Sequence, residues 1–484
     1  MSIMLDTTDP AEVTPGDQTP APARTPRRQL IRDAIRGTRA NLTTIALGDA
    51  IILLAVPMVL EMCMESIFAV ADVFWVGHLG ADAVATVGLT ESMMIIVYTL
   101  AMGLAVGAMA TVARRIGEQD TDGAARTTVQ AIALGLIGAA VMGTLGALFA
   151  PRLLAIMGAS PAVLASGSTF ARIMLGGCVS VFLLFLVNSC FRGAGDAAIS
   201  MRALWLSNAI NIGLGPLLIF GVGPFHRMGV TGAAVATTIG RSVGVLFVLW
   251  KLSVGSGHLK VARRHLEIMP QLMWKLVKLS GSVMLQFTIG SASWILLVRI
   301  VSTFGSAALA GYTIAIRIVL FALLPSWGLA NAAATLVGQS LGAKQPERAE
   351  RAVWTAARFN LYFLGGIGLL FVAFAGPLAS VFTIDREAAH IARVGLRTMA
   401  LGFPFYAFGM VFTQSFNGAG DTRTPTWLNL GVFWCLQTPV AWLLATRAGM
   451  GPGGAFLAVA IANATLAVVA GGLFRRGKWK LEKV

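Results

Sequence analysis

The 484-residue sequence has few charged side chains, because Asp, Glu, Lys and Arg together make up only 12% of it. Soluble globular domains carry about 25% of such residues. Hydrophobic residues make up 56% of the chain, and its mean hydropathy is +0.76. This composition excludes a soluble globular protein and predicts an all-α polytopic membrane protein.

The sequence also lacks the motifs of common catalytic and metal sites. It contains no Gly-x-x-x-x-Gly-Lys-[Ser/Thr] phosphate-binding loop and no His-Glu-x-x-His zinc motif. The four cysteines lie in apolar runs, and the five histidines show no metal-ligand spacing. We therefore expect neither an enzyme nor a bound cofactor, and no firm metal site.

Apolar runs of membrane-spanning length are abundant. There are twelve, near 45–76, 84–111, 125–150, 166–190, 199–221, 229–252, 272–303, 308–339, 350–376, 392–414, 425–446 and 453–474. They predict a first six-helix lobe at 45–252 and a second at 272–474. A basic linker at 253–271 joins the lobes, and a basic tail follows at 475–484. Residues 1–44 lack the apolar core of a signal peptide and predict a disordered tail with a basic amphipathic lead-in at 27–42.

The net charge of +15 is unevenly distributed along the chain. Lys and Arg gather in both termini and in every second loop, whereas the alternate loops hold only a few. Membrane proteins keep such loops in the cytoplasm, so we expect a multi-pass protein of the cell (inner) membrane with both termini cytoplasmic. The lipid bilayer explains the basic charge without a nucleic-acid partner.

The two predicted lobes are homologous. Phe-Arg-Gly-Ala-Gly-Asp at 191–196 recurs as Phe-Asn-Gly-Ala-Gly-Asp at 416–421, 225 residues later. The same offset aligns Gly-Leu-Ala at 103–105 with 328–330, and Gly117 with Gly342. Because each repeat has six spans, we expect two bundles related by a pseudo-two-fold axis along the membrane normal, an arrangement that transporters use.

Three acids lie in the stretch 57–72 of the first apolar run. Glu61, Glu65 and Asp72 fall within about 40° of one another on a helix, so they share one stripe. A carboxylate in the hydrocarbon is costly and indicates a polar interior. Pro57 can bend this helix one turn before Glu61. The alternative is three neutral acids that only join helices.

Other polar residues could complete a site with these acids. The candidates are Glu91 in the second run, Asn208 and Asn211 in the fifth, and Thr237 in the sixth. Their oxygens suit Na⁺, and the carboxylates alone could carry H⁺. Interhelical hydrogen bonding is the alternative for the amides and hydroxyls. When the two repeats are aligned at offset 225, neither the three acids nor Glu91 has an acid at the equivalent position of the second lobe. A single site in the first lobe is therefore favoured.

The repeated Gly-Ala-Gly-Asp motif predicts a structural loop after the fourth helix of each lobe. Glycine allows a positive φ in a tight turn, and the aspartate can cap the next helix. The residues concerned are Gly193, Gly195, Asp196, Gly418, Gly420 and Asp421.

These features resemble the multidrug and toxic compound extrusion (MATE) family. The resemblance rests on twelve spans in two halves, the repeated Gly-Ala-Gly-Asp motif, Val-Gly-His-Leu-Gly at 76–80 and Gly-Ala-Ala-Val-Ala-Thr at 232–237. It covers nearly the whole chain after residue 45. It implies cation-coupled export of amphipathic, often cationic compounds by alternating access.

The resemblance also implies roles for particular residues. Pro57 matches the bend proline, Asp72 the coupling aspartate, and Asn211 and Thr237 coordinating residues. Gly215 stands where the family often has Asp or Asn, and the second lobe lacks the acids of the norfloxacin-resistance type. These departures favour a DinF-like scheme in which the first lobe couples to H⁺ rather than Na⁺.

Together with this resemblance, the sequence predicts an antiporter, functional as a monomer, that exports amphipathic or cationic drugs or toxic compounds in exchange for H⁺. Exchange for Na⁺, bound at Asp72, Asn211 and Thr237, is the less favoured alternative. Asp72, Glu61, Glu65, Glu91, Asn211 and Thr237 are the predicted coupling residues. Asn208, Met64 and Arg317 are predicted to line the substrate cavity. The alternative is a flippase of lipid-linked precursors, which shares this architecture.

Overall fold

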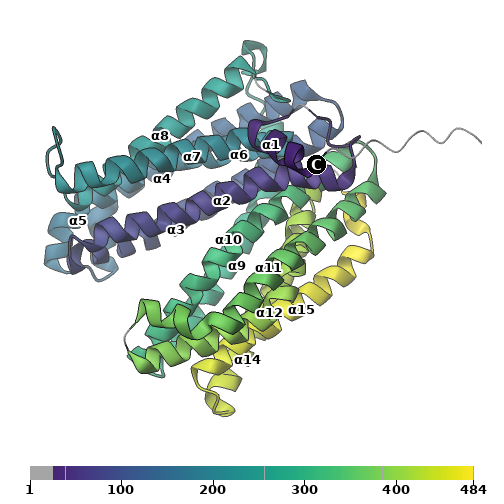
Figure 1. The fold of residues 1–484 in the computed structure, drawn as a ribbon. Helices are drawn as coiled ribbons and strands as arrows, with labels where there is room; N and C mark the ends of the chain where they lie inside the picture. Colours follow the sequence, from purple (N-terminus) through teal and green to yellow (C-terminus); the bar gives the residue numbers. More distant parts are fainter. Residues whose placement is uncertain (1–25, 39, 256, 384, 483–484) are drawn as a thin grey trace, which may run out of the picture.

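The computed structural model describes residues 26–482, apart from positions 39, 256 and 384 (Figure 1). The tail predicted to be disordered falls mostly outside the described residues. Within the described part of the chain the protein is helical and has no strands. Twelve of its helical segments are long and apolar enough to cross a membrane, as the sequence predicts.

The first bundle contains the six spans of the first repeat, and its fourth span consists of two helices that meet at Gly177. Its helices are α2 (Leu47–Gly77), α3 (Ala81–Gly117), α4 (Thr121–Ile156), α5 (Pro161–Gly176), α6 (Cys178–Ala194), α7 (Ala197–Phe220) and α8 (Val230–Val254). A short helix, α1 (Arg27–Arg36), precedes the bundle and packs on α2.

The second bundle repeats this plan, but its fifth span departs from regular α-helix. That span, Arg423–Arg447, includes π-helical segments at Leu430–Gln437 and Leu443–Arg447. The helices are α9 (Pro270–Ser302), α10 (Ser306–Gly342), α11 (Pro346–Phe382), α12 (Arg386–Ala419), α13 (Arg423–Asn429), α14 (Thr438–Trp442) and α15 (Pro452–Arg475).

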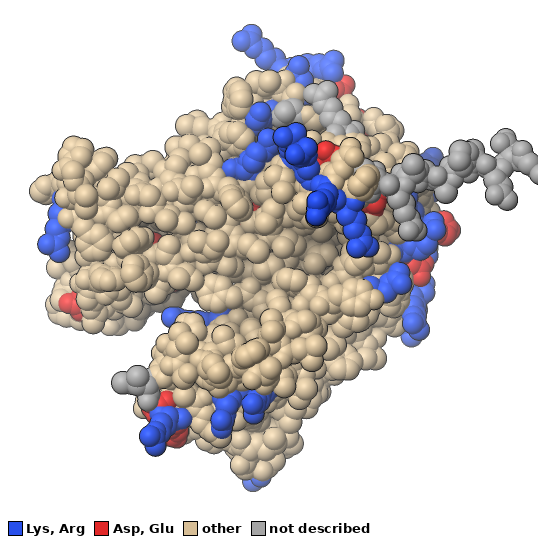
Figure 2. Space-filling view, viewed as in Figure 1, with Lys and Arg blue, Asp and Glu red and all other residues tan. Residues whose placement is uncertain are grey.

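The two bundles meet at one end of the molecule and diverge at the other. The two ends of the described chain lie where the bundles meet, which we call the closed end (Figure 1). The space-filling view shows a cleft between the bundles at the opposite end, which we call the open end (Figure 2). Helices α2 and α3 of the first bundle pack against α9 and α10 of the second. In this conformation the space between the bundles is closed at one end and accessible from the other.

Close contacts at the closed end follow the internal repeat. A Cβ on Gly117 of α3 would collide with the carbonyl oxygen of Gln339 on α10. A Cβ on Gly342 of α10 would collide with the carbonyl oxygen of Arg114 on α3. Since Gln339 stands 225 residues after Arg114 and Gly342 stands 225 after Gly117, the two contacts are equivalent. This exchange of partners is what a pseudo-two-fold axis between the bundles produces.

The Gly-Ala-Gly-Asp loops form the predicted turn in both halves, but the aspartate caps the next helix in only one of them. Gly195 and Gly420 both adopt φ of +94°, which ends α6 and α12 in a left-handed turn. Asp421 accepts a hydrogen bond from the Thr424 backbone N–H at 3.1 Å, as a cap would. The prediction is wrong for Asp196, whose carboxylate accepts from the backbone N–H of His258 at 2.8 Å instead. His258 lies in the linker between the bundles. The Asp196 carboxylate therefore binds the linker backbone instead of the first N–H groups of α7.

Candidate functional site

Two of the three acids that share the stripe on α2 are paired with other helices of the first bundle. The Arg192 guanidinium, at the end of α6, donates to Glu61 Oε1 at 2.7 Å. The Glu61 side chain is 3% exposed and that of Arg192 is 11% exposed. Asn208 of α7 donates from Nδ2 to Glu65 Oε2 at 3.0 Å. Helix α2 itself continues from Leu47 to Gly77 through Pro57, so one helix presents all three acids.

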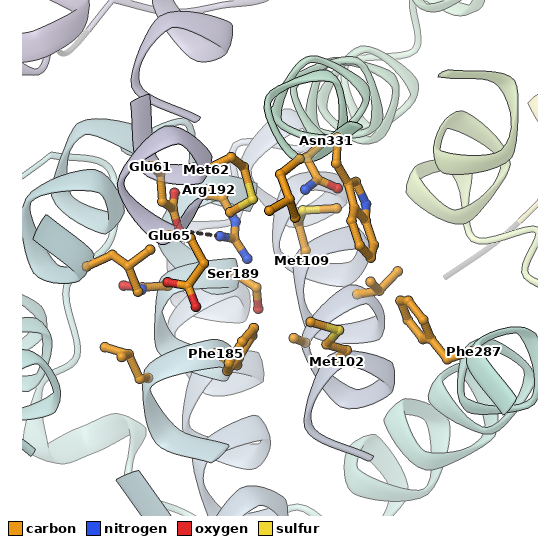
Figure 3. A pocket seen from close by; sticks show the side chains of 17 residues that line it. Glu61, Met62, Glu65, Met102, Met109, Phe185, Ser189, Arg192, Phe287 and Asn331 are labelled. Atoms are coloured by element: carbon orange, nitrogen blue, oxygen red, sulfur yellow. Dashed lines mark hydrogen bonds and ion pairs between the residues drawn. The ribbon is translucent and has the colours of Figure 1, made fainter. Parts of the chain in front are cut away.

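Glu61 and Glu65 border a cavity between the bundles (Figure 3). Its volume is about 140 Å³, and its walls are mostly apolar. The first bundle contributes side chains from α2, α3, α6 and α7, and the second contributes Phe287, Leu324, Trp327 and Asn331. The rings of Phe287 and Trp327 lie 5.9 Å apart. The acids thus face an apolar chamber whose far wall belongs to the other bundle.

The third acid of the stripe belongs to a different group nearer the open end. The Asp72 carboxylate lies close enough to Arg241 of α8 and to Glu91 of α3 for their charges to interact. Arg241 also donates to the Tyr98 hydroxyl at 3.0 Å. Glu91 interacts electrostatically with Arg317 of α10, across the space between the bundles. Within the described residues, the Asp72 carboxylate forms no hydrogen bond.

Asn211 and Thr237 form a separate pair. Asn211 Nδ2 donates to Thr237 Oγ1 at 2.7 Å, and both residues are buried. No hydrogen bond joins either of them to Asp72 in the described part of the chain, and there the acids, histidines and cysteines form no cluster that could hold a metal. There is open space beside Gly215. A Cβ added to Gly215 would lie 3.9 Å from Asn211 Oδ1 and would meet no closer atom. The sodium site predicted at Asn211, Thr237 and Asp72 stays a prediction.

The cavity beside Glu61 and Glu65 has other lining residues than those predicted for the substrate cavity. Asn208, Met64 and Arg317 are not among its lining residues. Asn208 donates a hydrogen bond to Glu65, and Met64 is buried. The charge of Arg317 acts on Glu91. Met62, Met102 and Met109 supply the thioethers of the wall instead (Figure 3).

Arg192 is a charged site residue that the sequence analysis missed. It stands inside the Phe-Arg-Gly-Ala-Gly-Asp motif, which indicated a loop. A signal for its pairing exists in the internal repeat, because Glu61 and Arg192 align with Gln286 and Asn417. An acid and a base are thus replaced together by two amides, as contacting residues would be.

One hydrolase-like pattern has no catalytic setting. The sequence Gly-Gln-Ser-Leu-Gly at 338–342 matches Gly-x-Ser-x-Gly. A nucleophile of that kind stands on an exposed strand-to-helix turn. Ser340 is instead buried within the last two turns of α10.

Two helical bundles around a mostly apolar chamber that is bordered by two acids are typical of a multi-pass membrane transporter. A family model, MatE, matches residues 57–217 and again 282–443. The chain belongs to this family of multidrug efflux transporters, and the double match coincides with the internal repeat.

Relatives and solved structures agree with this assignment. The chain is 24% identical to "Probable multidrug resistance protein NorM" of Thermotoga maritima, over 90% of this chain and 93% of that one. It is 25% identical to "FAD transporter" of Shewanella oneidensis, over 89% and 95%. A structure described as "Outward-facing conformation of a multidrug resistance MATE family transporter of the MOP superfamily" superposes with a TM-score of 0.85 at 26% identity, covering 94% of this chain and 98% of that one.

Proposed function

We propose that the protein is a secondary antiporter that exports amphipathic, cationic compounds in exchange for protons. The observation that carries this proposal is the placement of the acids. Glu61, Glu65, Asp72 and Glu91 all belong to the first bundle, and Glu61 and Glu65 border the cavity between the bundles. An acid in such a place exchanges a proton or a bound cation as its surroundings change.

In this proposal the closed end faces the cytoplasm. Lys and Arg side chains gather near the end that carries the termini (Figure 2), as they do on cytoplasmic surfaces. The cleft then opens outward, and the described conformation is the one that releases substrate. Transport requires the bundles to rock so that the closed end opens and the open end seals.

Asp72 and Glu91 are the proposed proton carriers. Asp72 has no hydrogen-bond partner within the described residues and lies toward the open end, whereas Glu61 is held in an ion pair. Protonation of Asp72 and Glu91 weakens their attraction to Arg241 and Arg317, and Arg317 belongs to the second bundle. A proton entering from outside would therefore change the interaction between the bundles directly.

The cavity provides the proposed substrate site. Its apolar and aromatic wall would hold a hydrophobic body, and Glu65 would attract a positive charge. One chain contains the whole cavity, so a monomer suffices. A lipid-precursor flippase would need a cationic chamber, and Glu61 and Glu65 oppose that alternative.

The test is efflux of a fluorescent cationic dye from vesicles that hold the purified protein. We expect transport when a pH gradient is imposed and none with a Na⁺ gradient alone. Transport driven only by Na⁺ would replace the proton by sodium in this scheme. Transport driven by neither gradient, with the protein shown to be folded, would contradict the proposal.

A further inference from the structure

A second cavity lies at the closed end, apart from the chamber that holds Glu61. Its volume is about 430 Å³, and more of its surface is polar than in the first. Its walls come from both bundles, from the loop after α12 and from the C-terminal segment after α15. It is therefore formed only while the bundles meet at this end.

Cationic side chains surround this cavity. Arg115 comes from α3, Lys275 and Lys278 come from α9, and Arg423 begins α13. Within the described residues Lys275, Lys278 and Arg423 form no ion pair. Arg115 is the exception, since Nη1 lies 3.2 Å from Glu118 and 3.6 Å from Asp120.

Two acids also line the cavity and do not balance these charges. Asp421 already accepts a hydrogen bond from the Thr424 backbone N–H at 3.1 Å. Glu482 is bound through its backbone oxygen, which accepts from Arg114 at 3.3 Å. Since Arg115 is already paired with Glu118 and Asp120, the other three cations exceed the two lining acids by one positive charge. Like charges from two bundles repel one another when the bundles close, and a bound anion would offset that repulsion.

We propose that this cavity binds a phosphate-bearing anion. Lys donors on one face of α9, three residues apart, together with an Arg fork on α13, suit a phosphate group with several oxygens. The volume is many times the roughly 30 Å³ share of one water molecule, so it admits more than an inorganic ion. Basic pockets between membrane helices bind such headgroups.

The chemistry has two sources, a lipid headgroup and a soluble phosphate compound. Trp274 precedes Lys275 on α9 and is 69% exposed, as an aromatic residue at the membrane interface would be. Leu272 and Leu279 give the cavity an apolar margin beside the charges. In either case the anion bridges Arg115 of the first bundle to the cations of the second, so binding favours the arrangement in which this end is closed.

The test measures binding to the purified full-length protein in neutral detergent. The probes are short-chain phosphatidylglycerol, short-chain phosphatidylcholine, inorganic pyrophosphate and inorganic sulfate, titrated by thermal shift and by calorimetry. The variant K275Q/K278Q/R423Q removes three charges from the cavity. The matched control R126Q/R263Q/R351Q removes three exposed charges that do not line it.

We expect phosphatidylglycerol or pyrophosphate to bind the native protein, and the cavity variant to weaken that binding on the order of tenfold or more. The control variant should stay within about threefold, as loss of distant screened charges predicts. Phosphatidylglycerol alone identifies a headgroup site, and pyrophosphate alone identifies a soluble ligand.

A second variant reverses the sign of the effect. E482Q removes an acid from the cavity, keeps the backbone contact to Arg114, and should tighten binding several-fold. This gain cannot arise from misfolding. Absence of binding by both phosphate probes, or equal losses in the cavity and control variants, would overturn the proposal.

Discussion

The two bundles solve the same structural problem with different chemistry at equivalent positions. In the first, Arg192 and Glu61 join α6 to α2 through an ion pair of 2.7 Å. In the second, 225 residues later, Asn417 and Gln286 join α12 to α9 through amide hydrogen bonds of 3.1 and 3.2 Å. The geometry of the repeat has been kept while the charge has been confined to one half.

The difference teaches which contacts the fold requires. A neutral amide pair is enough to connect these helices, because the second bundle uses one. The buried ion pair of the first bundle is costly to desolvate and is not needed for the fold alone. Its position on the wall of the central cavity gives the charge a place where a substrate or ion can meet it.

The largest effect that tests the asymmetry between the bundles is on transport. We expect D72N to be produced normally and to lose gradient-driven dye efflux, because an amide cannot bind and release a proton as the carboxylate does. Efflux from vesicles measures this. The control D82N, which removes an exposed acid at the start of α3, should transport normally. Normal efflux by D72N would show that coupling does not depend on this carboxylate.

The ion pair itself should respond to a swap between the repeats. E61Q leaves the buried Arg192 without its carboxylate and should cost about 3 kcal/mol of stability. The double variant E61Q/R192N rebuilds the amide pair of the second bundle and should recover most of that loss. Melting of the purified variants measures both. If the double variant is as unstable as E61Q, the two pairs are not interchangeable.

The glycines at the closed end should respond alike in the two bundles. G117A and G342A each place a methyl group against a backbone carbonyl of the other bundle, at a cost of about 2 kcal/mol. Labelling of cysteines introduced at the closed end should therefore rise equally in both. G281A, which has open space around it, is the control. A response from only one glycine would break the equivalence.

The smallest effect on stability is expected for the buried pair Asn211 and Thr237 of the first bundle. The second bundle has no polar residues at the equivalent positions. Asn211 and Thr237 align with Leu436 and Ala462. Loss of one interhelical hydrogen bond in N211A should cost about 1 kcal/mol. Melting measures the stability, and efflux measured in parallel shows whether the residue does more. Transport unchanged within twofold would assign Asn211 a packing role only.

Much of the fold could be predicted from the sequence. Spans read from apolar runs match the twelve helical segments, although five of the helices continue beyond the runs by several residues into the loops. The left-handed turns at Gly195 and Gly420 followed from the motif. The π-helical segments of the eleventh span carried no such signal, because they depend on how that span packs against α9 and α15.

The candidate site was predicted in part. The stripe of acids on α2 was visible because helical periodicity fixes which residues share a face. The sequence did not show that the three acids of the stripe have different partners. Glu61 pairs with Arg192, Glu65 with Asn208, and Asp72 lies near Arg241, and these partners come from three other helices. Asp196 likewise bonds to the linker rather than capping its own helix.

Sequence by itself thus determined the number of spans, the two-fold repeat and the half that carries the acids, because hydropathy, periodicity and internal identity are properties of one chain segment. Tertiary structure alone decided which acid is paired, that Met62 rather than Met64 faces the cavity, and that cations of both bundles surround a second cavity. Those outcomes depend on how helices far apart in the chain rotate and cross, and no local pattern encodes that rotation.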